Sequence, residues 1–398
     1  METVSQGGTR TGNSTRSKKH ESDAKSWVTN RAIQSCVQNT LLTTGVFLAT
    51  ILMMFTARGT QTASYVIFDN DFYGPASTNL QAAALLLNSD AKTLGLTVVT
   101  GDGWRDEEVA HTLRLLEILG RTDVPVVPGA VFPLVSTKAK QQTWEKSFGI
   151  IPWKGAWNDP KEGLFPDYKS HGPFEIPHLD EGEPQIKAAN EIAANFLIRQ
   201  VHQYPHEVTI VAAGPLTNLA LAIRLDPEFA SLAKELIFMG GLIGTGFSKA
   251  TGNPDFASDF NLLFDPEAAE IVLTADWPKI TAVGEVTNDT MFTADLVKRI
   301  AQRKTPLTEY IAKYAETGVP LWDELTVGIF VDPTLVTKQT AVAMDVDLSH
   351  GPAYGTARIW SDAVAPHLGE RKVDIVQAVD VNRFVDEFVS AMQSASVK

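Results

Sequence analysis

From residue 64 onward, short apolar runs alternate with longer amphipathic stretches. The apolar runs predict strands: YVIFDND, LGLTVVTGD, VPVVPGA, VTIVAAG, ELIFMGG and KITAVGEVT. The stretches between them, such as DEEVAHTLRLLEILG and EPQIKAANEIAANFLIRQVHQY, have the apolar spacing of amphipathic helices. Strands that alternate with helices are typical of an α/β fold with a doubly wound, mostly parallel sheet and flanking helices. We therefore predict one such domain over residues 64–398.

Residues 135–183 interrupt this alternation. The segment is rich in Pro and Trp and has no clear periodicity. A connection of this length is typically a lid, a binding loop or a disordered segment. The pattern resumes afterwards, and AVDVNRFVDEFVSAM predicts a closing helix near the end of the chain.

The first 60 residues have a different composition. Residues 1–40 are polar and rich in Ser and Thr, and we predict that they are disordered. Residues 41–57 carry no charge and would span about 25 Å as a helix, slightly less than a bilayer core. A buried core helix is the alternative to a transmembrane segment or signal anchor. Basic residues precede the run: Lys18, Lys19, Lys25 and Arg31. We predict a single-pass membrane protein of the endoplasmic reticulum or secretory pathway with a lumenal domain.

Composition excludes several classes of partner and site. The formal net charge is −13, and no Lys/Arg stripe follows residue 60, so nucleic acid is not expected as a partner. The only cysteine, Cys36, precedes the predicted domain, which excludes a disulfide framework and a cysteine metal site within this chain. We expect a small-molecule substrate. Homo-oligomerisation is left open by the sequence.

Polar residues gather where the predicted strands end. Asp69 and Asp71 follow the first strand, Asp102 follows the second, and Ala213 follows the fourth. Ligands of doubly wound sheets bind beyond the carboxyl ends of the strands. We therefore expect the functional site at this edge.

Three stretches together resemble the inosine/uridine-preferring nucleoside hydrolase family. They are VAAGPLTNLALAIRLDPE at 211–228, IFMGG followed by GNPDFASDFNLLFDPEAAEIVL, and LWDELTVGIFVDPTLV at 321–336. With the first strand, the resemblance covers about residues 64–395. It implies the family's fold and cleavage of the N-glycosidic bond of a nucleoside. Family members typically use one Ca²⁺ to orient the ribose and a water, and an aspartate takes the proton of that water.

The first loop departs from the family pattern. Asp69 and Asp71 match the first two acids, and the resemblance makes Asp71 a metal ligand and the base. The paired acids that should follow are missing, and Ser77 and Thr78, or neighbours, stand in their place. Because Ca²⁺ prefers six to eight oxygen ligands, this loss implies a weak or lost calcium site. No other cofactor is expected.

The later motifs are partly kept. The resemblance makes Asp323 the late metal ligand, and Ala213 the residue whose carbonyl binds the metal. Trp322 stands where many members have a histidine that protonates the leaving base, and an indole cannot act as that acid. Asn253, Asp259 and Asn261 match ribose-contact positions, with Asp259 in place of a usual Glu.

These departures replace acids with aromatic side chains, including Tyr73 and Trp322. Our leading hypothesis is therefore an enzyme repurposed to bind and convert a hydrophobic small molecule without hydrolysis. Cyclisation or rearrangement, including pericyclic ring closure, in specialised metabolite biosynthesis would suit such a pocket. One alternative is an N-ribosyl hydrolase with a weakened metal site, and another is a non-catalytic ligand-binding protein.

The candidate catalytic residues are Asp71, Asp323 and Trp322. The candidate substrate-binding residues are Asp69, Tyr73, Ser77, Thr78, Asp102, Asn253, Asp259, Asn261 and Trp322.

Overall fold

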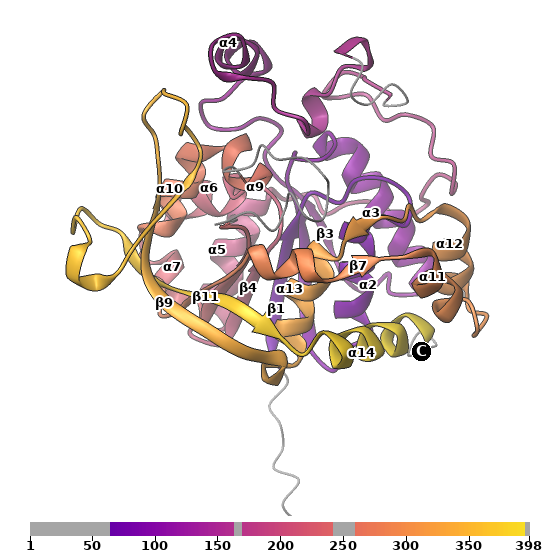
Figure 1. Ribbon diagram of the computed structural model, residues 1–398. Coiled ribbons are helices and arrows are strands. Elements are labelled where there is room, and N and C mark those ends of the chain that lie inside the picture. Colours follow the sequence, from indigo (N-terminus) through magenta and orange to yellow (C-terminus); the bar gives the residue numbers. More distant parts are fainter. Residues whose placement is uncertain (1–63, 163–168, 242–258, 395–398) are drawn as a thin grey trace, which may run out of the picture. The chain divides into compact units, whose positions relative to one another are not determined.

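The computed structural model describes residues 64–162, 169–241 and 259–394 (Figure 1). The chain divides into two units, 1–62 and 63–398, and all described residues belong to the second. The segments predicted as disordered (1–40) and as an anchor (41–57) therefore lie outside the described residues. Asn253, a candidate ribose contact, lies outside them as well.

The predicted single-pass membrane location is corrected by the structure. None of the helices in the described ranges has the length and apolar character needed to cross a membrane. The run at 41–57, on which the prediction rested, is not among the described residues. The predicted lumenal location of the domain depended on this membrane assignment, so it is corrected as well.

The predicted α/β fold is confirmed. The described residues form a nine-stranded sheet in the order β10-β9-β11-β6-β5-β4-β1-β2-β3. All six predicted strands are present: β1 (Tyr65–Asn70), β2 (Lys92–Val98), β3 (Val126–Pro128), β4 (Val208–Ala212), β5 (Glu235–Met239) and β6 (Ile280–Val283). These six strands are parallel to one another. The sheet is therefore mostly parallel, as the alternating pattern indicated.

Three further strands extend the sheet beyond β6. They are β9 (Val336–Val346), β10 (Ala357–Trp360) and β11 (Arg371–Val379). β11 pairs with β6 in parallel, whereas β9 is antiparallel to both β11 and β10. The first half of β9 is polar and mostly exposed, and its apolar run, AVAM at 341–344, is short. The periodicity therefore did not reveal this part of the sheet.

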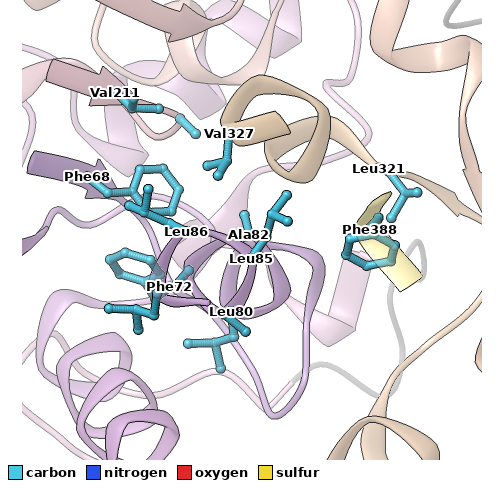
Figure 2. Close-up of a cluster of buried hydrophobic side chains, with 14 of the residues drawn as sticks. Phe68, Phe72, Leu80, Ala82, Leu85, Leu86, Val211, Leu321, Val327 and Phe388 are labelled. Atoms are coloured by element: carbon cyan, nitrogen blue, oxygen red, sulfur yellow. The ribbon is translucent and has the colours of Figure 1, made fainter. Parts of the chain in front are cut away.

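Side chains of each inner strand alternate between two cores. In β1, Val66 and Phe68 enter one cluster of buried residues and Ile67 enters the other. Figure 2 shows part of the first cluster, in which Phe68 and Phe72 lie beside leucines of the following helix. All of these side chains are almost completely removed from water. Burial on both faces explains why the inner strands read as continuous apolar runs.

Helices cover both faces of the sheet. The first core is closed by α2 (Thr78–Leu87), α3 (Arg105–Leu119), α11 (Ala294–Ile300), α12 (Pro306–Tyr314), α13 (Trp322–Val331) and α14 (Val381–Gln393). The second is closed by α5 (Ala193–Gln203), α6 (Thr217–Leu225), α7 (Phe229–Leu232) and α10 (Pro266–Leu273). A small two-stranded sheet, β7 (Met291–Phe292) with β8 (Val319–Pro320), and α9 (Phe260–Phe264) complete the longer connections. The arrangement is doubly wound.

The strand order reverses at β1. The chain runs outward from β1 through β2 to β3, then returns to place β4 on the other side of β1. Neighbouring connections therefore leave in opposite directions and open a crevice at the carboxyl ends of β1 and its neighbours. The loops after β1, β2 and β4 carry the residues singled out from the sequence.

The insertion at 135–183 contains regular structure that its composition did not predict. It forms α4 (Lys138–Phe148), which has no buried residue, and the short helices η1 (Gly155–Trp157) and η2 (Pro160–Glu162). In Figure 1, α4 is drawn at the top of the view. By contrast, the three residues of η1 are buried. The insertion therefore combines an exposed helix with a docked segment.

A chain that begins at Ser64 is expected to fold by itself. Residues 63–398 form a compact unit with its own two cores, so we expect this unit to keep its fold when the preceding segment is removed. Thermal unfolding of this fragment and of the full chain should give the same Tm. A Tm lower by more than roughly 3 °C, which corresponds to about 1 kcal/mol for a domain of this size, would contradict independent folding.

Candidate active site

Asp71 follows β1 directly, at the point where the strand order reverses, and is 1% exposed. Its Oδ2 accepts a hydrogen bond from the backbone N–H of Asp102 at 2.9 Å. A Cβ atom added to Gly101 would lie 2.0 Å from Asp71 Oδ2, and one added to Gly214 would lie 2.8 Å from Oδ1. The carboxylate is thus packed directly against backbone after β2 and β4, and glycine is required at both contacts.

Asn79 is a site residue that the sequence analysis missed. Its amide nitrogen lies 3.5 Å from Oδ1 of Asp71 and 3.4 Å from Oδ2 of Asp102. Ser77, which was a candidate, instead caps α2 by accepting from the backbone N–H of Leu80 at 3.4 Å. The helix cap was the feature of the sequence that could have revealed Asn79. A helix that begins after a Ser77 cap has Asn79 in its first turn, close to the loop after β1.

Asp323 opens α13 beside the first loop and is 4% exposed. Its Oδ2 accepts from the side-chain amide of Asn70 at 2.9 Å, and Oδ1 of that asparagine accepts from the backbone N–H of Asp71 at 2.9 Å. Asn70 therefore links the two candidate catalytic aspartates, although they are far apart in sequence. Trp322 is half-buried, packs against the first core, and directs its indole N–H to Oδ1 of Asn288 at 3.4 Å.

Asp69 is fully buried beneath the site. Its Oδ2 accepts from the hydroxyl of Thr97 at 2.5 Å and from the side-chain amide of Asn218 at 2.8 Å. Oδ1 of Asn218 in turn accepts from the backbone N–H of Ala130 at 2.8 Å. Asp69 therefore ties together the loops after β1, β3 and β4. Its role as a substrate contact stays a prediction.

The described ribose-contact candidates lie beyond β4 and β5. Asn261 is 6% exposed and donates to the backbone carbonyl of Ala213 at 2.7 Å. Asp259 caps α9 by accepting from the backbone N–H of Leu262 at 3.2 Å. Thr78 is the half-buried first residue of α2. The fold brings Asn261 and Ala213 into direct contact. The substrate contact of Thr78 stays a prediction.

The carboxylates of the site strongly affect one another. Burial, followed by the charges of Asp102 and Asp323, raises the pKa of Asp71 well above its usual range. Burial also raises the pKa of Asp102 to about 6 and that of Asp323 to about 7, and hydrogen bonds from Asn79 oppose both shifts. Like charges this close in a buried site cannot all ionise freely. An ionised Asp71 in this site therefore binds a proton more strongly than an exposed aspartate does.

Two aromatic side chains border Asp102. The ring of Tyr73 packs on Gly103, where an added Cβ would lie 2.5 Å from Cδ2 of the ring. Burial and the charge of Glu107 raise the pKa of the Tyr73 hydroxyl. On the other side, the indole N–H of Trp153 donates to Oδ1 of Asp102 at 2.5 Å. The site thus has one wall from the first loop and one from the insertion.

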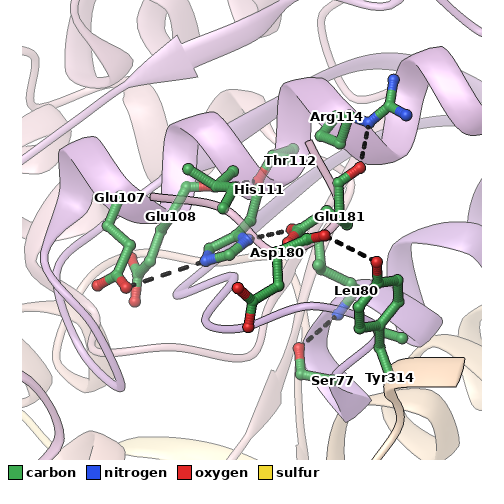
Figure 3. A network of polar contacts seen from close by, with 12 residues as sticks. Ser77, Leu80, Glu107, Glu108, His111, Thr112, Arg114, Asp180, Glu181 and Tyr314 are labelled. Carbon is green, nitrogen blue, oxygen red and sulfur yellow. Dashed lines mark hydrogen bonds and ion pairs between the residues drawn. The ribbon is translucent and has the colours of Figure 1, made fainter. Parts of the chain in front are cut away.

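A second polar network joins the insertion to α3 (Figure 3). His111 is 4% exposed and lies between Glu107 on its own helix and Glu181 of the insertion, with Nδ1 2.5 Å from Oε1 of Glu181. His171 of the insertion meets Oε2 of Glu107 at 2.9 Å. The backbone carbonyl of His171 also accepts from the indole of Trp104 at 3.0 Å. These contacts fasten the end of the insertion beside the site.

The residues present do not fit the calcium shell that the resemblance implies. Hydrogen bonds from protein donors compete for the lone pairs of each proposed ligand group: Asp71 accepts from Asp102, Asp323 from Asn70, and the carbonyl of Ala213 from Asn261. The described part of the chain contains no group of three or more His, Cys, Asp or Glu side chains arranged to hold a metal ion. Asn79 brings a neutral amide to the place where Ca²⁺ would be favoured by another carboxylate.

We expect calcium to bind weakly, with a Kd above about 10 μM by calorimetric titration. Asn79→Asp should tighten binding, because it adds an anionic oxygen next to Asp71 and Asp102. Asn88→Asp is the matched control, since Asn88 caps the other end of α2 and bonds to the carbonyl of Ala391. Sub-micromolar affinity of the unmodified protein would contradict this prediction.

His111 should make stability depend on pH. Burial acts to lower the pKa of His111, but hydrogen bonds and charges from Glu107 and Glu181 outweigh it and raise the pKa from 6.5 to about 9. The stabilisation is therefore complete below pH 6.5 and is lost as the pH rises towards 9. The difference in unfolding free energy between the native chain and His111→Gln should shrink across this window by on the order of 2 kcal/mol. His178→Gln, at an exposed position in the same insertion, is the control, and an equal response of both variants would refute the prediction.

Comparison with known proteins agrees with this fold. The family model described as "Inosine-uridine preferring nucleoside hydrolase" matches residues 66–386. An uncharacterised protein of Schizosaccharomyces pombe is 30% identical over 351 residues, which cover 83% of this chain and 85% of that protein. A probable uridine nucleosidase 2 of Arabidopsis thaliana is 32% identical over 292 residues, covering 70% of this chain and 80% of that protein.

Solved structures share the architecture. A purine-preferring ribonucleoside hydrolase from Gardnerella vaginalis superposes with a TM-score of 0.64 at 24% identity, covering 83% of this chain and 99% of that chain. At this identity, the superposition supports the fold alone. Together with the family model, which spans both the first loop and α13, these likenesses establish that the chain belongs to the inosine-uridine preferring nucleoside hydrolase family.

Proposed function

We propose that this protein hydrolyses the N-glycosidic bond of a ribonucleoside. The observation that carries the proposal is the buried carboxylate of Asp71, packed between Gly101 and Gly214 at the point where the strand order reverses. Polar side chains that suit sugar hydroxyls surround it, among them Asn79 and Asp102. Relatives named as uridine nucleosidases and as pyrimidine-specific ribonucleoside hydrolases support the same reaction class.

In this reaction Asp71 is the base. A water that attacks the anomeric carbon of the ribose transfers its proton to a carboxylate oxygen of Asp71 as the bond to the base breaks. Positive charge develops on the sugar ring in such a reaction, and the neighbouring carboxylates of Asp102 and Asp323 stabilise it. Because the donor set does not fit a calcium shell, no step is assigned to a metal.

The leaving base receives no proton from the position that supplies one in many family members. Trp322 has that position, and its indole N–H is already directed at Asn288. General-acid catalysis typically accelerates such a step by roughly 100-fold or more. Departure of the nucleobase without an acid is slower by that factor. We therefore propose a slow hydrolase that favours nucleosides whose base is a good leaving group.

The comparisons favour hydrolysis over our leading hypothesis from the sequence, which was non-hydrolytic conversion of a hydrophobic molecule. That hypothesis rested on lost acids and added aromatic rings. In the structure, Phe72 is fully buried in the first core, and Trp322 packs partly against the same core. Some of the aromatic side chains that the sequence suggested would line a pocket therefore pack in the core instead. The site retains several buried polar groups, which a purely apolar ligand would leave without partners.

The proposed function is tested by assaying purified protein with uridine and inosine. Release of free base and ribose is expected, and Asp71→Asn should abolish it. Trp322→His should raise kcat by about tenfold or more, because imidazole can protonate the leaving base. Trp360→His on the edge strand β10 is the control and should leave kcat unchanged.

Two outcomes would overturn the proposed function. One is failure of both the native chain and Trp322→His to cleave any common ribonucleoside, with correct folding confirmed by circular dichroism. The other is full retention of cleavage in Asp71→Asn, which would show that Asp71 is not the base.

A further inference from the structure

The insertion touches the active site through one tightly docked segment, residues 153–158. The backbone N–H of Ala156 donates to the carbonyl of Gly101, which precedes Asp102, at 2.9 Å. Gly155 has a φ of +54°, and a Cβ added to it would lie 2.0 Å from the carbonyl oxygen of Gly101. No side chain fits at position 155. The segment is therefore fitted directly onto the backbone of the loop after β2.

Buried contacts hold the segment in this position. Trp157 is 4% exposed, and its ring lies 4.4 Å from that of Phe264 between ring centroids. Lys154 is also 4% exposed and pairs with Glu145 of α4 at 3.0 Å. A buried ion pair and a buried aromatic pair each favour one arrangement of the chain. The segment is thus part of the rigid frame of the domain.

The position of segment 153–158 places the side chain of Trp153 next to Asp102. Its indole N–H donates to Oδ1 of the carboxylate, a charge-assisted hydrogen bond of 2.5 Å. Among the described residues, the other oxygen, Oδ2, has only the long 3.4 Å contact with the amide of Asn79. The backbone N–H of Asp102 is already bonded to Asp71. One oxygen of Asp102 is therefore fixed by the insertion, and the other lies on the side of Asn79.

We propose that Trp153 is a positioning residue that orients the carboxylate of Asp102 so that Oδ2 accepts a hydrogen bond from a ribose hydroxyl of the substrate. The inference rests on the proposed ribonucleoside hydrolysis and extends it, because it makes the insertion a component of the sugar-binding site. The competing explanation is that Trp153 only anchors the insertion. The two explanations differ in what happens when the N–H group alone is removed.

Trp153→Phe removes the N–H group and keeps an aromatic ring. Trp144→Phe is the matched control, because Trp144 lies in the same insertion and donates its indole N–H to the backbone carbonyl of Gly351 at 2.8 Å. We expect Trp153→Phe to raise KM for uridine by about tenfold with kcat changed less than about twofold, as for loss of an interaction present in both ground and transition states. Trp144→Phe should change neither. An unchanged KM in Trp153→Phe would overturn the proposal.

The identity of the hydroxyl group is tested with 2′-, 3′- and 5′-deoxyuridine. If Oδ2 of Asp102 accepts from one hydroxyl, the substrate that lacks it should show no rise in KM with Trp153→Phe, while the others keep the rise. Gly155→Ala should reproduce the same pattern, because it undocks the segment without touching Trp153. An equal rise for all three substrates would assign Trp153 an anchoring role and overturn the proposal.

Crystal structures of the native chain, Trp153→Phe and Trp144→Phe separate this proposal from the proposed function. The Asp102 carboxylate should rotate away from its native orientation in Trp153→Phe alone. If it stays in place, Trp153 does not position it, whatever the activity. If the native chain cleaves no nucleoside, the proposed function fails, and these structures still decide whether Trp153 positions Asp102.

Discussion

The close packing of a buried carboxylate against bare backbone is the constraint on which the site depends. Asp71 leaves the end of β1 and meets Gly101 and Gly214 at distances that exclude any side chain at either position. This contact is available only because β1 lies between β2 and β4, where the strand order reverses. The free-energy cost of burying the charge is partly offset by the N–H of Asp102, and burial also raises the pKa values of the neighbouring Asp102 and Asp323.

Three layers of support surround this carboxylate. Asp69 lies below it and joins loops from three strands through Thr97 and Asn218. Asn70 links Asp71 to Asp323 at the side. The insertion closes the remaining side, where Trp153 reaches Asp102. Since each support comes from a different part of the chain, the geometry of the site depends on the whole domain and not on the first loop alone.

The departures from the family pattern change the chemistry more than the architecture. Asn79 offers a neutral amide among acids, which weakens the case for calcium without removing the polar contacts. Trp322 cannot supply a proton, but its ring adds packing against the first core. A scaffold can keep its fold through such substitutions because the two cores, and not the site, provide most of its stability.

The sequence by itself determined the six inner strands, several of the flanking helices and the family. Buried parallel strands must be apolar on both faces, so their pattern is visible along the chain. The ends of such strands converge, which singled out Asp71 and Asp102. Asp323 was singled out by the family resemblance alone. The tertiary structure alone revealed β9, whose first half is polar and mostly exposed, and the contacts of Asn79 and Trp153. Those two residues act through contacts with Asp102, at separations of 23 and 51 residues along the chain, which no local pattern encodes.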